Sequence, residues 1–143
     1  MSKIRKGSWR TSKIVNELST PNFNEATVNI STDGTTLILF REGKLLFSEK
    51  DYTGWSTPIE LPKTINSGIW NSDATISSNG EALIFASVRE NSKNLFTKNN
   101  NNYHGDNQYP SDIYIALKDQ NDNWGDPINI GDSINTSFTE RSP

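Results

Sequence analysis

Short segments of alternating or apolar residues, each closed by a polar turn, organise the first half of the chain. Four such segments predict strands, at residues 26–31, 37–40, 45–47 and 55–61. Gly34 and Gly43 provide the tight turns between the first three. Pro58 removes a ladder donor, so the fourth strand is expected at a sheet edge. The apolar runs are too short for helices, and we predict an all-β fold.

The same pattern returns 46 residues later. The segment Ser-Thr-Asp-Gly-Thr-Thr-Leu-Ile-Leu-Phe at 31–40 is followed by Ser-Ser-Asn-Gly-Glu-Ala-Leu-Ile-Phe-Ala at 77–86. Strands of this second unit are predicted at residues 74–77, 82–87, 112–117 and 124–130. An internal repeat of this length indicates stacked supersecondary units.

Further markers follow the same register. Trp9 and Trp55 are 46 residues apart, and Trp124 follows after another 69. Ile-Asn-Ser at 65–67 returns 69 residues later as Ile-Asn-Thr. The excess of 23 residues in the second interval predicts an insertion, which we place at the Asn-rich segment 89–110.

Four strands in each repeat of this length are typical of a β-propeller blade. We therefore predict two full blades of four antiparallel strands with partial flanking strands. Residues 7–18 are the outer strand of a preceding blade, 19–61 and 62–130 are the two blades, and 131–143 start the next one. Propellers use about 4–8 blades. Three arrangements therefore stay open: part of a longer propeller, a ring of several copies, or a pair of sheets that dimerises.

Several motifs carry a family resemblance. They are Ser31, Asp33, Gly34 and Leu37; Asp112-Ile113-Tyr114; Trp124-Gly125-Asp126-Pro127; and Ile134-Asn135-Thr136 with Glu140. With these, the chain resembles the TolB-like, WD-repeat-like family of bacterial β-propellers over most of its length. The resemblance implies an extracytoplasmic module for binding or scaffolding. Residues with a structural role in the repeat are expected to be Trp9, Trp55, Trp124, Asp33, Gly34, Asn79, Gly80, Asp112 and Tyr114.

Composition and charge narrow the classes of partner. A net charge of −3 gives no basic field for nucleic acid. No apolar run is long enough for a membrane span, and no signal-peptide core is visible. The apolar fraction of 32% leaves a thin core, which favours burial against other blades or other copies of the chain.

The search for catalytic chemistry gives no candidate. His104 is the single histidine and cysteine is absent, which excludes a His/Cys metal cluster within one chain. The carboxylates Glu25, Asp73, Asp112 and Glu140 are interpreted as turn and cap residues. We predict no catalytic residue, no metal ion and no cofactor, and thus a module that is not an enzyme.

Candidate binding residues lie in two places. Trp70 breaks the register of the repeat and could be a surface aromatic for a sugar or a partner. In the insertion, Tyr103, His104, Asp106 and Tyr109 mix aromatic and polar groups, although a low-complexity decoration is the alternative interpretation. The sequence favours a protein-interaction or scaffolding module that binds itself or another protein. A carbohydrate-binding or glycan-processing propeller fragment is the alternative.

Overall fold

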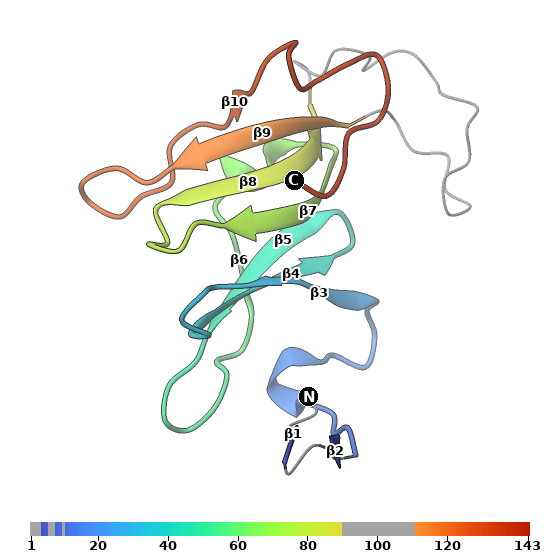
Figure 1. Cartoon of the computed structure of the whole chain (residues 1–143), viewed down its shortest axis with the longest axis vertical. Coiled ribbons are helices and arrows are strands. Elements are labelled where there is room, and N and C mark those ends of the chain that lie inside the picture. Colours follow the sequence, from blue (N-terminus) through green and yellow to red (C-terminus); the bar gives the residue numbers. More distant parts are fainter. Residues whose placement is uncertain (1–3, 6–7, 10, 90–110) are drawn as a thin grey trace.

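A computed structural model describes residues 4–5, 8–9, 11–89 and 111–143 (Figure 1). Within these ranges the chain is all-β, as predicted, with two short 3-10 turns. The strands are β1 (Ile4–Arg5), β2 (Ser8–Trp9), β3 (Glu25–Ile30), β4 (Thr36–Arg41), β5 (Lys44–Glu49), β6 (Ile59–Glu60), β7 (Trp70–Ile76), β8 (Ala82–Val88), β9 (Asp112–Leu117) and β10 (Ile128–Asn129), and the 3-10 turns are η1 (Asn16–Leu18) and η2 (Ile65–Ser67).

Two four-stranded antiparallel sheets carry the repeat. Sheet 1 has the order β3-β4-β5-β6, and sheet 2 has the same order in β7-β8-β9-β10. Each predicted strand of the two units corresponds to one of these strands, and β9 has the predicted bounds 112–117. The predicted fourth strands 55–61 and 124–130 are shorter in the structure. Each consists of one isolated bridge, at Trp55 or Trp124, and two paired residues, in β6 or β10.

The two sheets pack face to face, with sheet 2 above sheet 1 in Figure 1. Strand β7 lies against β3, β4 and β5. The core between the sheets consists of Ile38, Leu45, Leu61, Ile65, Ala74, Leu83, Phe85, Tyr114 and Ala116. Within the described residues the pair of sheets closes neither a barrel nor a ring.

The extra residues of the second unit lie on both sides of β9. Equivalent positions of β5 and β9, Lys44 and Asp112, are 68 residues apart, whereas those of β6 and β10 are 69 apart. The one-residue difference lies after β9, because the bridge Lys118–Trp124 encloses one residue more than the bridge Lys50–Trp55. The predicted 23-residue insertion is thus divided between two loops.

Both β3 and β7 contain a β-bulge. The ladder to the neighbouring strand shifts between Thr27 and Asn29 in β3, and between Ser72 and Ala74 in β7. Asp73, within the second bulge, has a φ of 42°. Because these strands are at the edge of their sheets, each sheet has one irregular edge.

The two ends of the described chain differ from the predicted flanking strands. In place of an outer strand over 7–18, β2 pairs with β1, and η1 follows. A fourth strand needs the third strand of its own sheet as a partner, and the described residues contain none for this segment. Residues 131–143 form a turn and an extended segment, in which the Glu140 N–H donates to the Ser111 carbonyl oxygen (2.9 Å).

Candidate functional site

The face of sheet 1 that is turned away from sheet 2 carries an apolar groove of about 520 Å³. We call this the outer face of sheet 1. The groove is lined by Val15, Leu18, Thr27, Ile30, Leu37 and Leu39, among others. Ile30 leaves 45% of its surface exposed here. In Figure 1 the N-terminal segment with η1 and the loop between β5 and β6 lie on this side of sheet 1.

The outer face of sheet 1 is the repeat equivalent of a buried face. Its residues Ile30, Leu37, Leu39, Leu46 and Trp55 correspond to Ile76, Leu83, Phe85, Tyr114 and Trp124. These five belong to sheet 2 and its loop, and they pack in the core between the sheets. The sequence therefore provides the same apolar face twice, covered once by a complete sheet and once only by a short segment.

The N-terminal segment contains a turn equivalent to the one that precedes sheet 2. The Leu18 N–H donates to the Val15 carbonyl oxygen (3.1 Å), as the Ile65 N–H donates to that of Pro62 (2.9 Å). Leu18 packs against Leu37, Leu39, Leu46 and Trp55, in the place that Ile65 has in the core between the sheets. The N-terminal segment thus supplies the turn of a covering sheet without its strands.

The outer face of sheet 2 is the repeat equivalent of the face of sheet 1 that packs in the core between the sheets. Its apolar residues Ile84, Ala86, Ile113, Ile115, Ile130 and Ile134 are the equivalents of Ile38, Phe40, Leu45, Phe47, Leu61 and Ile65. Leu117, Ile128 and Ile134 leave more than half of their surface exposed on or beside this face. The two outer faces therefore have the residue types of the two faces that already meet inside the molecule.

Two buried asparagines fix the loops that follow the sheets. Asn66 accepts from the Leu45 N–H (2.9 Å) and donates to the carbonyl oxygens of Leu45 and Leu61 (both 2.9 Å). Asn135 accepts from the Ile113 N–H (2.7 Å) and donates to the Ile113 carbonyl oxygen (2.9 Å). The Ile-Asn-Ser/Thr repeat was visible in the sequence, but its role depends on a strand far away in the chain.

Glu25 of sheet 1 and Asn71, at the equivalent position 46 residues later in sheet 2, have different partners. Glu25 forms an ion pair with Arg41 and accepts from the Thr20 N–H (2.8 Å). Burial raises the pKa of Glu25, but the bonds from Thr20 and Arg41 outweigh burial and hold that pKa below its usual value. In sheet 2 the amide of Asn71 stands here, bonded to the Ser87 hydroxyl (2.7 Å) and the Gly43 carbonyl oxygen (3.0 Å).

The acidic turn residues are engaged in local bonds. Asp33 accepts from the Ser31 hydroxyl (2.6 Å) and the Thr35 N–H (3.0 Å), and these bonds lower its pKa. Asn79 has the same partners by position, the Ser77 hydroxyl (2.6 Å) and the Glu81 N–H (3.3 Å). Gly34 and Gly80 follow with a φ of 74°. All these contacts belong to turns.

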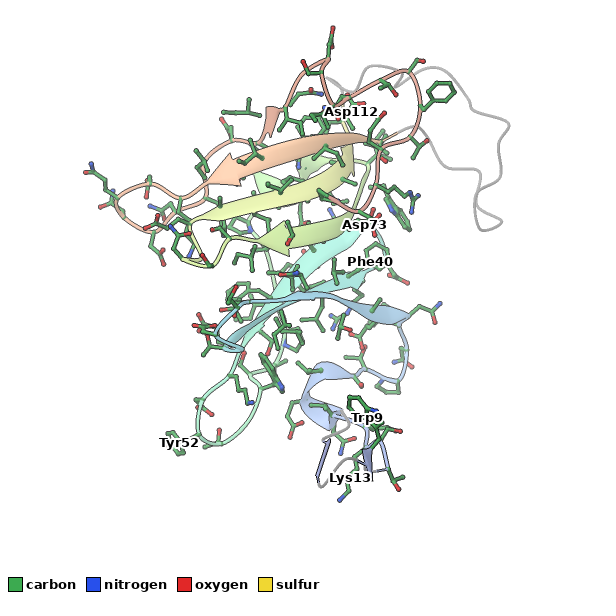
Figure 2. The ribbon with its side chains drawn as sticks, viewed as in Figure 1. Trp9, Lys13, Phe40, Tyr52, Asp73 and Asp112 are labelled. Atoms are coloured by element: carbon green, nitrogen blue, oxygen red, sulfur yellow. The ribbon has the colours of Figure 1, made fainter. Side chains whose placement is uncertain are left out.

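The other predicted repeat residues lie in different environments. Trp55 is buried and Trp124 half-buried, whereas Trp9 is 70% exposed on β2, at the N-terminal end in Figure 2. Asp112 and Tyr114 are almost fully buried in β9, and Asp112 accepts from the Asn129 amide (2.8 Å).

The predicted binding residues are not brought together by the described structure. Trp70 is half-buried and packs against Phe40, with ring centroids 5.2 Å apart. A Cβ atom at Gly43 would lie 2.9 Å from the same indole ring. Tyr103, His104, Asp106 and Tyr109 lie outside the described residues.

Arg89 is a structural residue that the sequence did not reveal. Its guanidinium lies over the rings of Phe85 (5.1 Å) and Tyr114 (5.2 Å) and donates to the Thr64 carbonyl oxygen (3.2 Å). Burial lowers the pKa of Arg89. The side chain ties the η2 turn to sheet 2, and nothing in the local sequence distinguishes it from a surface arginine.

The chain matches no protein-family model, no curated protein and no solved structure. Among the described residues, no three histidine, cysteine or acidic side chains are grouped as a metal site would require. Helices with the length and apolarity to cross a membrane are also absent from this part of the chain. The feature that the described residues offer for binding is the apolar groove on the outer face of sheet 1.

Proposed function

We propose that the chain is a two-blade propeller segment and acts as a non-enzymatic module for protein interaction or scaffolding, in which further protein covers its open sheet faces. One observation carries the proposal. The outer face of sheet 1 repeats, residue by residue, the face of sheet 2 that is buried against another sheet. An apolar face with this pattern loses free energy when it is covered, at roughly 25 cal/mol for each Å² of apolar surface removed from water.

The chemistry of the groove favours protein over carbohydrate. Aliphatic side chains line most of its floor, and none of the described residues that line it is aromatic. Sugars are usually held by stacking on an exposed aromatic ring together with polar groups. Trp70, one of the two predicted places for a glycan, packs against Phe40 and Gly43. The carbohydrate alternative would then depend on Tyr103, His104, Asp106 and Tyr109, which lie outside the described residues.

A photo-crosslinking amino acid in place of Ile30 tests this function. The matched control carries the same group in place of Tyr52, which is 99% exposed at a loop tip (Figure 2). Both proteins are irradiated in purified form and in the cells that produce them, and adducts are identified by mass spectrometry. We expect a defined protein adduct from position 30 and none from position 52. An absence of any position-30 adduct in both settings would overturn the interaction function.

A further inference from the structure

We propose that the groove on the outer face of sheet 1 binds the outer face of sheet 2 of a second copy of this chain, with the geometry of the sheet-to-sheet contact inside the molecule. This inference rests on the proposed function and names the partner of the same surface. The argument has three steps: the match of the two faces, the place of the N-terminal turn, and the symmetry of the contact.

The contact between sheet 1 and sheet 2 inside the molecule indicates which residues of the two outer faces would meet. Inside the molecule, Ile76 lies in a cleft between the sheets together with Ile38 and Phe47. The equivalents of these residues are Ile30 on one outer face and Ile84 and Ile115 on the other. Ile30 of one copy would therefore meet Ile84 and Ile115 of the next. Each contact joins aliphatic side chains, as in the existing core.

Charge does not oppose this contact. On the side of the groove, Glu25 and Arg41 already form an ion pair with each other. The facing positions in β8 and β9 are isoleucines and an alanine, and beside them Arg141 pairs with Asp73 (3.8 Å) while the Glu140 carboxylate accepts from the Thr136 N–H (3.0 Å). Unpaired charges would be expensive to bury in such a contact. Among the described residues that line the groove, Glu25 is the only one with a charged side chain, so no unpaired charge would be buried there.

The N-terminal turn occupies one place that the second copy needs. The Ile134 N–H donates to the Gly131 carbonyl oxygen (3.1 Å), the same turn as that of Leu18 with Val15 and of Ile65 with Pro62. Ile134 of the incoming copy would therefore take the site of Leu18. The turn before Ile134 is held by buried Asn135, whereas Ser19, at the equivalent of Asn66, is exposed. Leu18 and its turn therefore yield, and so does the segment at Glu140, whose N–H donates to the Ser111 carbonyl oxygen as the Asn71 N–H donates to that of Gly43, at the place of Glu25 of the other copy.

The contact is heterologous, since it joins two different faces of the chain. Repetition of such a contact gives a ring if the rotation closes and a filament if it does not. With two sheets in each copy, the usual 4–8 blades of a propeller correspond to about two to four copies. Discrete rings of this size are the expected assembly.

The test measures mass in solution by size exclusion with light scattering over a range of concentrations. The variants are Ile30→Glu on the outer face of sheet 1 and Ile115→Glu on that of sheet 2, with Tyr52→Glu as the control. Circular dichroism and a cooperative melt establish that each is folded; Ile134→Glu, at a side chain 54% exposed, replaces Ile115→Glu if the latter unfolds. We expect oligomers for the wild type and the control. Each face variant should be weakened about 30-fold or more by a buried carboxylate.

Mixing the two face variants distinguishes a heterologous contact from a symmetric one. The mixture still has one intact face of each kind, so we expect a one-to-one heterodimer that neither variant forms with itself. We also expect Leu18→Ser to tighten association, by about threefold or more, because the competing turn is released. A role of Leu18 in folding alone would not raise affinity.

Two results would overturn the second-copy proposal. One is a wild-type monomer at all concentrations; if position 30 then cross-links to a different protein, the interaction function stands while this inference fails. The other is that Ile115→Glu still associates with itself while Ile30→Glu does not and the mixture forms no heterodimer, which would indicate a symmetric contact between two sheet 1 faces.

Discussion

Asn66 and Asn135, 69 residues apart in the chain, perform the same task at equivalent places. Each side-chain amide accepts the N–H and donates to the carbonyl oxygen of one residue, Leu45 for Asn66 and Ile113 for Asn135. Both side chains are buried. They fasten the turn after each sheet to the third strand of that sheet, which gives the turn a fixed position for the next layer.

Replacing either asparagine by alanine is expected to destabilise the fold strongly. Asn66→Ala leaves the Leu45 N–H and two carbonyl oxygens without this partner, and each buried group left unpaired costs about 1–3 kcal/mol. Urea unfolding measures the free energy of unfolding. Asn22→Ala, at an exposed position, is the control and should change it little. A loss for Asn66→Ala no larger than that of the control would show that water replaces the side chain.

The two phenylalanines of β4 and β8 should differ in their contribution to stability. Phe85 is fully buried, whereas Phe40 is half-buried. Phe85→Ala should cost about 3–5 kcal/mol, because it leaves a cavity in the core between the sheets. Phe40→Ala should cost less, since part of its ring already contacts water. Thermal or urea unfolding compares the two; equal losses would contradict the burial pattern.

The aspartate turn of sheet 1 is expected to make part of the stability depend on pH. The bonds of Asp33 hold its pKa below the usual value of 3.8. Its contribution is therefore present above the pKa of the unfolded chain and is lost as the pH falls through the lower folded pKa. In Asp33→Asn the amide keeps the geometry that Asn79 has in sheet 2.

We expect Asp33→Asn to show a shallower loss of unfolding free energy between neutral pH and about pH 3. At neutral pH the variant should be only slightly less stable than the wild type. Urea unfolding at the two pH values gives the comparison. An unchanged pH dependence would assign the acid sensitivity to other carboxylates, such as Asp51 and Asp119, whose pKa values are also lowered by turn bonds.

Two glycines with the same backbone conformation offer a matched pair. Gly34 and Gly43 have φ values of 74° and 79°. A Cβ atom at Gly34 would meet nothing within 4 Å, whereas one at Gly43 would lie 2.9 Å from the indole of Trp70. Gly34→Ala should cost about 1–2 kcal/mol from backbone strain alone. Gly43→Ala should cost more, because the Trp70 ring must move; equal losses in urea unfolding would mean that the ring shifts freely.

The strands and the repeat could be predicted from the sequence because both depend on local pattern. Alternation, Asp-Gly and Asn-Gly turns and the 46-residue spacing placed β4, β8 and β9 within one or two residues. The propeller architecture that the repeat suggested stays a prediction.

The remaining features depend on contacts between distant residues. Alternation shows that two faces exist, but not which face is covered, so the groove on the outer face of sheet 1 needed the structure. The structure was also needed for the partial burial of Phe40, which lies towards one end of β4, and for the packing of Trp70, whose partners come from sheet 1. Arg89 is engaged by the η2 turn, which no pattern near position 89 indicates.

The bulges in β3 and β7 have a consequence for how such a chain can grow in evolution. A strand with a shifted ladder is a poor template for another strand, so neither sheet is easily widened at that edge. Duplication of one gene segment would instead add a new layer on the open face, through a contact that the existing pair already uses. Each added layer then brings its own increment of stability, as in other linear repeat proteins. The chain can thereby become longer while the layers already present stay unchanged.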